Sequence, residues 1–214
     1  MTYSVKELFY TLQGEGAQTG RPAVFCRFAG CNLWSGLERH RDSAICSFCD
    51  TDFVGTDGQG GGKFTDADSL AAAIDAAWPE DSVDTKKYVV CTGGEPLLQL
   101  DEALISALHS KDFEVAVETN GTIKAPEGID WICVSPKGTA SLVQTRGDEL
   151  KLVYPQTEES AQPSCFADLE FQHKYLQPMD GPLQRENTQQ TIDFCMRNPV
   201  WKLSVQTHKI VGIE

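Results

Sequence analysis

Short apolar runs rich in β-branched and aromatic residues alternate along the chain with segments whose apolar residues recur at helical spacing. The runs that predict β-strands cover residues 23–30, 87–92, 114–119, 130–135, 149–154, 174–178 and 202–207. One helix is predicted to begin at Thr65, where Thr-x-x-Asp resembles a capping box, and two more cover 101–111 and 187–197. The predicted apolar faces of the three helices are Ala67, Leu70, Ala71, Ile74, Ala77 and Trp78; Leu104, Ile105 and Leu108; and Ile192, Cys195 and Met196.

The alternation of strands and helices indicates parallel βα units joined by right-handed crossovers. We therefore expect an α/β fold whose sheet is either a curved, partly open barrel or doubly wound. Most of the apolar runs end in a polar turn, namely TGGEP, ETNG, SPK, LQP and QTHK. Because the carboxyl ends of parallel strands form the active-site face of such folds, these turns predict one pocket rim.

Composition and charge narrow the class of protein. The 214 residues fit one domain, and a content of 41% hydrophobic and 23% charged residues is ordinary for a folded, water-soluble protein. No stretch approaches the roughly 20 apolar residues of a membrane span, and the first residues lack the layout of a signal peptide. We therefore expect a cytoplasmic protein with no membrane contact. A formal charge of −13 also argues against nucleic acid as a partner.

The glycine-rich segment GTDGQGGGKF, residues 55–64, invites comparison with a phosphate-binding loop. It lacks the G-x-x-x-x-G-K-[ST] pattern, because Lys63 is followed by Phe64, and no strongly apolar strand runs into it. A surface loop is the better interpretation.

Three of the eight cysteines, Cys31, Cys46 and Cys49, lie in one polar loop with the spacing C-x14-C-x2-C. In a reducing compartment, clustered thiols are more often metal ligands or catalytic groups than disulfide partners. A structural zinc site requires four ligands, and His40 or Cys26 could complete one. Three thiolates on a [4Fe-4S] cluster would instead leave one iron free to bind a small molecule. Cys26, Cys91 and Cys133 lie in apolar strands and are interpreted as small hydrophobic residues.

The cysteine loop, together with Gly-Gly-Glu at 93–95, resembles the radical S-adenosylmethionine (SAM) superfamily. Most members use C-x3-C-x2-C, and this chain inserts eleven residues between the first two cysteines. That variant, with LQGEG at 12–16, RFAGCNLW at 27–34, CDT at 49–51, TGGEP, ETNG and SPK, is similar to the 7-carboxy-7-deazaguanine synthase family over nearly the whole chain. The resemblance implies a single radical SAM domain over 1–214, with a cluster-binding loop at 31–49. It also implies an incomplete β/α barrel with a curved, mostly parallel sheet.

The resemblance further implies a carbon–nitrogen lyase. Its substrate would be 6-carboxy-5,6,7,8-tetrahydropterin, which is rearranged with loss of ammonia to 7-carboxy-7-deazaguanine on the way to deazapurines such as queuosine. A [4Fe-4S] cluster on the three cysteines, SAM and Mg²⁺ would be the cofactors. A flavodoxin or ferredoxin would supply electrons, and the protein would be a homodimer. Two alternatives stay open: a zinc-stabilised binding module, and a radical SAM enzyme of the type that activates glycyl-radical proteins.

The resemblance assigns site residues one by one. Arg27 would grip the substrate carboxylate, although a strand-end ion pair is the simpler interpretation, and Thr51 would bind Mg²⁺. Further substrate contacts would come from Leu12, Gln13, Gly14, Glu15, Thr92, His208 and Glu214. SAM would contact Phe48, Cys49, Gly93, Gly94, Glu95, Ser135, Pro136, Lys137, Gln177, Pro178 and Met179. Glu118 and Asn120 of ETNG would shape the rim or form a structural turn.

Overall fold

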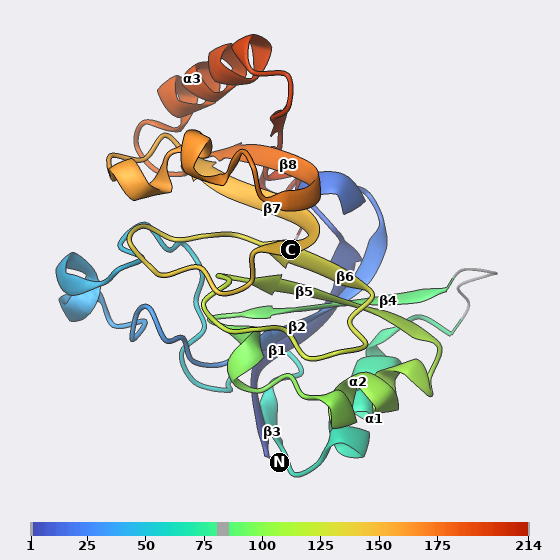
Figure 1. Ribbon diagram of the computed structural model, residues 1–214. Helices are drawn as coiled ribbons and strands as arrows, with labels where there is room; N and C mark the ends of the chain where they lie inside the picture. Colours follow the sequence, from blue (N-terminus) through green and yellow to red (C-terminus); the bar gives the residue numbers. More distant parts are fainter. Residues whose placement is uncertain (1, 81–85, 214) are drawn as a thin grey trace.

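The fold is built around one nine-stranded sheet, and the computed structural model describes residues 2–80 and 86–213 (Figure 1). The order across the sheet is β3-β1-β2-β4-β5-β6-β7-β8-β9. The strands are β1 (Tyr3–Leu12), β2 (Pro22–Phe28), β3 (Gly62–Phe64), β4 (Lys87–Gly93), β5 (Phe113–Thr119), β6 (Trp131–Val134), β7 (Arg146–Tyr154), β8 (Glu170–Pro178) and β9 (Lys202–Leu203).

From β2 to β9 every neighbouring pair of strands is parallel, whereas β1 runs antiparallel to both β2 and β3. The sheet is therefore mostly parallel, and its two edges, β3 and β9, do not pair with each other. This confirms the predicted α/β class with an incomplete barrel. The parallel register brings strand ends together, as where Arg27 of β2 lies opposite Thr92 of β4.

Four α-helices accompany the sheet: α1 (Ala67–Ala77), α2 (Glu102–His109), α3 (Gln184–Arg197) and α4 (Thr207–Val211). Five short 3-10 helices occupy the connections: η1 (Gly16–Gln18), η2 (Glu38–Ser43), η3 (Pro96–Leu98), η4 (Glu159–Ala161) and η5 (Pro163–Phe166). Helices α1 and α2 pack against each other beside the first half of the sheet, and α3 packs on β8 and β9 (Figure 1). No helix within 2–80 and 86–213 combines the length and apolarity needed to cross a bilayer.

The core consists of two hydrophobic clusters that meet at Ile132 of β6. The larger cluster joins β1, β2, β4 and β5 to α1 and α2, and the smaller one joins β6, β7 and β8 to α3. Cys26, Cys91 and Cys133 are buried in their strands, as predicted. The apolar faces predicted for the first two helices are also confirmed, since Leu70, Ile74, Leu104, Ile105 and Leu108 are buried.

Two predicted helix details are wrong. The first helix is capped by Asp66, whose side chain accepts from the Ser69 backbone N–H while the Ser69 hydroxyl accepts from the Asp66 N–H, so the box starts one residue after Thr65. The third helix begins at Gln184 rather than 187, and its buried residues are Asn187 and Thr191. Met196 is 79% exposed, because this helix covers only the edge of the sheet.

The strand predictions erred in three places. The opening segment forms β1, the longest strand, which had not been predicted. The glycine-rich segment 55–64 ends in β3, which pairs with β1 from Tyr3↔Phe64 to Val5↔Gly62 and is therefore not wholly a loop. The predicted strand 202–207 is reduced to Lys202–Leu203, because α4 begins at Thr207.

Candidate active site

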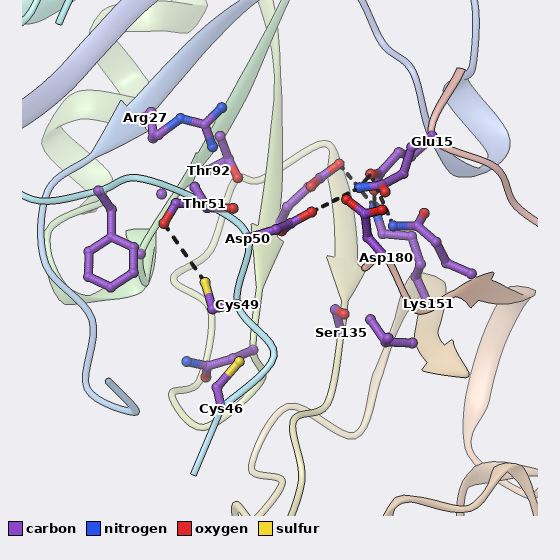
Figure 2. Close-up of a pocket in the computed structure, with 18 of the residues that line it drawn as sticks. Glu15, Arg27, Cys46, Cys49, Asp50, Thr51, Thr92, Ser135, Lys151 and Asp180 are labelled. Atoms are coloured by element: carbon purple, nitrogen blue, oxygen red, sulfur yellow. Dashed lines mark hydrogen bonds and ion pairs between the residues drawn. The ribbon is translucent and has the colours of Figure 1, made fainter. Parts of the chain in front are cut away.

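A cavity of about 410 Å³ opens where the parallel strands end, and all but three of the site residues predicted from the sequence line it (Figure 2). The lining residues among them are Leu12, Gln13, Gly14, Glu15, Arg27, Cys31, Cys46, Phe48, Cys49, Thr51, Thr92, Gly93, Gly94, Ser135, Lys137, Gln177, Pro178, Met179 and His208. Glu95 and Pro136 do not line it, and Glu214 is outside the described residues. The fold thus gathers residues that lie up to about 200 positions apart in the sequence.

The cysteine loop forms one wall of this cavity. Cys31 follows β2, and burial raises the pKa of its thiol. The Cys46 thiol donates a hydrogen bond to Cys49, which lowers the pKa of Cys49 to about 6 despite its burial. Lys137, also on the wall, favours the ionised form of both sulfurs. In the part of the chain that the structure describes, no three His, Cys, Asp or Glu side chains are arranged to hold a metal ion.

Arg41, within the inserted part of the loop, ties its two ends together. Its guanidinium donates to the carbonyl oxygens of Ser47 at 2.8 Å and Cys49 at 3.0 Å. It also lies 4.3 Å over the ring of Trp34 and pairs with Glu38. The inserted segment is therefore held in place by contacts of its own arginine. Sequence reasoning missed Arg41, because a single arginine in a polar loop gives no signal.

The Gly-Gly-Glu turn packs directly against the start of the cysteine loop. A Cβ at Gly94 would lie 1.9 Å from the Gly30 carbonyl oxygen, so only glycine fits there. Glu95 is completely buried, and its carboxylate accepts from the Leu97 N–H, the Asn120 N–H and the Thr119 hydroxyl at 2.7 to 2.9 Å. Burial raises the pKa of Glu95, against these hydrogen bonds.

The ETNG turn after β5 joins this arrangement. The Asn120 amide donates to Asn32 on the cysteine loop at 2.9 Å. Its carbonyl oxygen accepts from the backbone and the hydroxyl of Thr122. Asn120 therefore links two parts of the rim, and Glu118 lies on the cavity wall.

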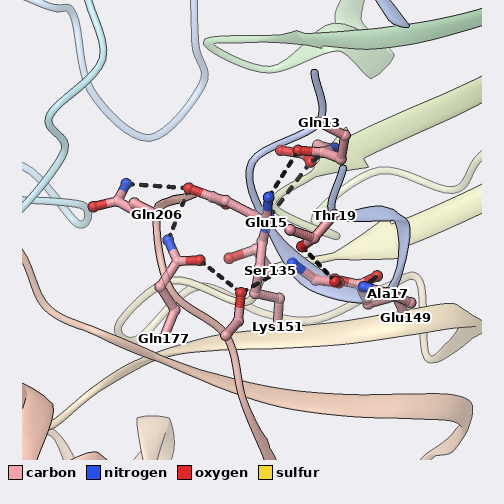
Figure 3. A network of polar contacts seen from close by, with 12 residues as sticks. Gln13, Glu15, Ala17, Thr19, Ser135, Glu149, Lys151, Gln177 and Gln206 are labelled. Carbon is pink, nitrogen blue, oxygen red and sulfur yellow. Dashed lines mark hydrogen bonds and ion pairs between the residues drawn. The ribbon is translucent and has the colours of Figure 1, made fainter. Parts of the chain in front are cut away.

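A buried ionic network forms the wall on the side of Glu15 (Figure 3). Lys151 of β7 lies with its ammonium 2.5 Å from Glu15 and 3.4 Å from Glu118. The other Glu15 oxygen accepts from Gln177 at 3.0 Å and from Gln206 at 3.1 Å. Burial alone would raise the pKa of Glu15, but Lys151 outweighs it and the pKa is lowered. Sequence reasoning assigned no role to Lys151.

Arg27 and Thr92 lie at neighbouring strand ends in the same cavity as Thr51 (Figure 2). The Arg27 Nε donates to Glu7 of β1 at 2.7 Å, so the ion pair expected from a simple structural role is present. Glu7 itself lines the cavity. The pair leaves the terminal guanidinium nitrogens of Arg27 without a hydrogen bond among the described residues that line this cavity.

Helix α4, near the carboxyl terminus of the chain, contributes His208 and Lys209 to the cavity wall. The Thr207 N–H donates to the Gly14 carbonyl at 2.9 Å, and the His208 ring lies so close to Gly14 that a Cβ there would be 2.3 Å from its Nδ1. Lys209 lies 2.7 Å from Asp50, beside the last cysteine, and 2.6 Å from Asp180, after β8. This segment is therefore fastened to both ends of the site.

The comparisons with known proteins agree with this geometry. No protein-family model matches the chain. The crystal structure of QueE from Escherichia coli matches with a TM-score of 0.72 and 28% identity, over 97% of this chain and 95% of that one. An open β/α sheet with a three-cysteine loop beside a Gly-Gly-Glu turn is the arrangement of radical SAM enzymes, and this chain has the fold of that class.

Sequence relatives narrow the class further. The chain is 65% identical to the 7-carboxy-7-deazaguanine synthase of Bordetella pertussis and 63% identical to that of Caulobacter vibrioides, over 100% of all the sequences compared. The chain belongs to the 7-carboxy-7-deazaguanine synthase family. This confirms the resemblance noted in the sequence and favours it over a zinc-stabilised module or an activating enzyme.

Proposed function

We propose that this protein converts 6-carboxy-5,6,7,8-tetrahydropterin to 7-carboxy-7-deazaguanine with loss of ammonia, an early step toward deazapurines such as queuosine. The observation that supports this most strongly is the composition of the 410 Å³ cavity. Three thiols of one loop form one part of its wall, and Arg27 with the Glu15 network forms another. A radical SAM lyase needs both halves in one enclosed space, because the reacting groups must be close together and shielded from water.

The three cysteines suit a [4Fe-4S] cluster better than a single ion. A structural zinc site requires four ligands, and the loop supplies three cysteines. Three thiolates on a [4Fe-4S] cluster leave one iron free to bind SAM, which agrees with the family to which the chain belongs. Cys31, Cys46 and Cys49 would hold the cluster, which when bound would supply the one-electron reduction of SAM that side chains cannot provide.

The walls on either side suit SAM and Mg²⁺. Ser135, Lys137, Pro178 and Met179 line the cavity after strand ends and would hold the nucleoside portion, with Phe48 and Gln177. Pro136, between Ser135 and Lys137, does not line the cavity, and its SAM contact rests on the family resemblance. Gly93 and Gly94 line the cavity as Cys31 does and would contact the methionine portion through their backbone, although their lack of a Cβ serves packing against β2 and Gly30, and Glu95 binds the protein's own backbone. Thr51 would offer its hydroxyl to Mg²⁺, with water and the substrate carboxylate completing the octahedron.

The substrate itself is a flat heterocycle with a carboxylate at one end and N–H donors at the other. The free guanidinium nitrogens of Arg27 would bind the carboxylate in a two-pronged contact, and Glu15 would accept from the amino-pyrimidinone edge. Leu12, Gln13, Gly14 and Thr92 would contribute backbone and hydroxyl contacts, and His208 would cover the ring. A role for Glu214, which is outside the described residues, rests on the family resemblance alone. In this role the chain's own residues orient the substrate and exclude water.

Several broader features belong to the same proposal. One continuous sheet supports a single domain over 1–214. Eight free cysteines are in keeping with a reducing compartment such as the cytoplasm. We also propose a homodimer, to be checked by sedimentation, and a flavodoxin or ferredoxin as electron donor, to be checked by replacing the chemical reductant with either protein.

Turnover under anaerobic conditions tests the function. Reconstituted protein should contain about four iron and four sulfide per chain, as a cubane requires. With reductant, SAM, Mg²⁺ and the tetrahydropterin it should release ammonia and a product of the mass of 7-carboxy-7-deazaguanine. Cys46→Ala should lose iron and turnover, whereas Cys165→Ala, at an exposed free thiol, should lose neither. SAM cleavage without the deazapurine would contradict the proposal.

A further inference from the structure

Lys151 is the most deeply buried charged group in the cavity wall. Its side chain is only 5% exposed, yet it carries an ammonium on β7, an interior strand that lies between β6 and β8. Removing a charge from water is costly unless nearby groups compensate for it. The compensation here comes from Glu15, 14% exposed and 136 residues away in sequence, and from Glu118. Because burying this charge is costly, we expect Lys151 to have a role in the chemistry of the cavity.

The contacts of Glu15 indicate what that role is. Its partners Lys151, Gln177 and Gln206 all donate to it, so Glu15 is presented as an acceptor. The burial of Glu15 alone favours the protonated acid, which would turn one of its oxygens into a donor. Lys151 opposes that change because it is the permanent cation beside it.

We propose that Lys151 is a positioning residue that fixes the Glu15 carboxylate as an acceptor and thereby makes the cavity select heterocycles with adjacent N–H donors. The identity of that heterocycle as a pterin rests on the proposed function. An ionised carboxylate matches a 2-amino-pyrimidinone edge with two parallel hydrogen bonds. An analogue with a carbonyl oxygen in place of the amine sets acceptor against acceptor, which such a site rejects strongly.

Other titratable groups face Glu15 but cannot replace Lys151. Glu118 from β5 and Glu149 from β7 are acids, and burial raises the pKa of Glu149, which accepts from the Ala17 N–H. Cys133 from β6 is a buried thiol whose pKa is raised well above its usual range. His208 from α4 adds positive charge only when it is protonated, and its contact with Glu15 is electrostatic rather than a hydrogen bond.

Substitutions of Lys151 in the reconstituted holoenzyme test the inference. Lys151→Met removes the charge and keeps the length, Lys151→Arg keeps the charge, and Lys202→Met on the exposed edge strand β9 is the control. Binding of 6-carboxypterin and of 6-carboxylumazine, its 2-oxo analogue, is measured alongside KM and kcat for the tetrahydropterin. We expect the wild type and the Lys202 variant to prefer the pterin by roughly 10- to 100-fold, the range for hydrogen bonds to a charged group.

The Met variant should lose most of that preference. Its KM should rise by about tenfold at neutral pH with kcat little changed, and the Arg variant should recover at least part of both. Without Lys151, burial raises the pKa of Glu15, so the KM of the Met variant should fall as pH rises, whereas the wild-type KM should not. A structural defect alone would not produce this pH profile. An unchanged preference and KM in Lys151→Met would overturn the inference.

A second comparison guards against misfolding of the Met variant. Glu15→Gln and the double variant Glu15→Gln/Lys151→Met replace the ion pair with neutral groups in one and two steps. If Lys151 acts through Glu15, the second change should add less than about twofold to the KM of the first. If the two substitutions raised KM independently, so that the double variant showed the product of the two single increases, the positioning role would be refuted. Failure of the wild type to convert the tetrahydropterin would contradict the proposed function instead. The binding of the pterin and the lumazine would still test the role of Lys151.

Discussion

Glu95 offers a sharp test of how the site is built, because the family resemblance assigns it to SAM whereas its contacts are to the protein backbone. Replacing it with Gln keeps the shape of the side chain. One oxygen can continue to accept from Leu97 and Thr119. The other becomes an NH2 group facing the Asn120 N–H, at the site where the donor and acceptor are now 2.8 Å apart.

The cost follows from that geometry. A buried donor left without an acceptor costs about 1–3 kcal/mol. Glu95→Gln leaves one such donor, the Asn120 N–H, so we expect it to lower the free energy of unfolding by about 1–3 kcal/mol. Glu95→Ala leaves two backbone donors and a cavity, so its loss should be larger, about 2–6 kcal/mol from the donors alone. The raised pKa of Glu95 shows that burying its charged form is costly. Because neutral Gln avoids this cost, we expect the destabilisation by Glu95→Gln to lie toward the lower end of about 1–3 kcal/mol.

Urea unfolding of the cluster-free protein, followed by circular dichroism under reducing conditions, measures these differences. The exposed Glu127→Gln is a matched control and should stay within about 0.5 kcal/mol of the wild type. SAM affinity of the reconstituted variants is measured in parallel. A Glu95→Gln protein of wild-type stability with weakened SAM binding would refute the structural role and favour a direct contact.

Three more outcomes can be measured with the same preparations. Leu104→Ala, at a fully buried position of α2, should lower the unfolding free energy by about 2–5 kcal/mol, and a loss under 1 kcal/mol would contradict the packing of α2 on the sheet. Arg21 lowers the pKa of Glu114 by a hydrogen-bonded ion pair, so this stabilisation is present above the usual carboxyl pKa and is lost as pH falls through the lowered one. The stability gap between wild type and Glu114→Gln should therefore close in acid, and a gap that is constant from pH 7 to pH 3 would argue against it. Lys209→Met removes the cation that fastens α4, so it should raise the substrate KM several-fold with little change in Tm; an unchanged KM would show that the fastening does not matter for binding.

Those strands that are buried on both faces could be predicted from the sequence. The continuous apolar runs of β4 and β5 gave a clear signal of this kind. β1 was missed because Lys6 and Glu7 interrupt its centre. Lys6 is buried only through ion pairs with Asp52 and Asp57, about fifty residues away, and a local pattern cannot reveal partners at that distance.

The site was readable where motifs lie at the ends of parallel strands, because the topology alone brings such ends to one edge. The polar network behind them was not. Glu149, Lys151 and Val153 alternate with the buried Leu150 and Leu152, so one face of β7 carries charge in the middle of a parallel sheet. That alternation is the signal that could have identified Lys151 as a residue of the cavity wall.

The meeting of two hydrophobic clusters at Ile132 has a consequence for how the protein responds to occupancy. Contacts across the cavity join the loop after β1, in one half, to β7 and β8, in the other. A small molecule bound between the two halves contacts both of them. Because it binds only when both halves are folded, its binding free energy stabilises them together. Ligand binding should therefore make unfolding of this enzyme more cooperative than that of the empty protein.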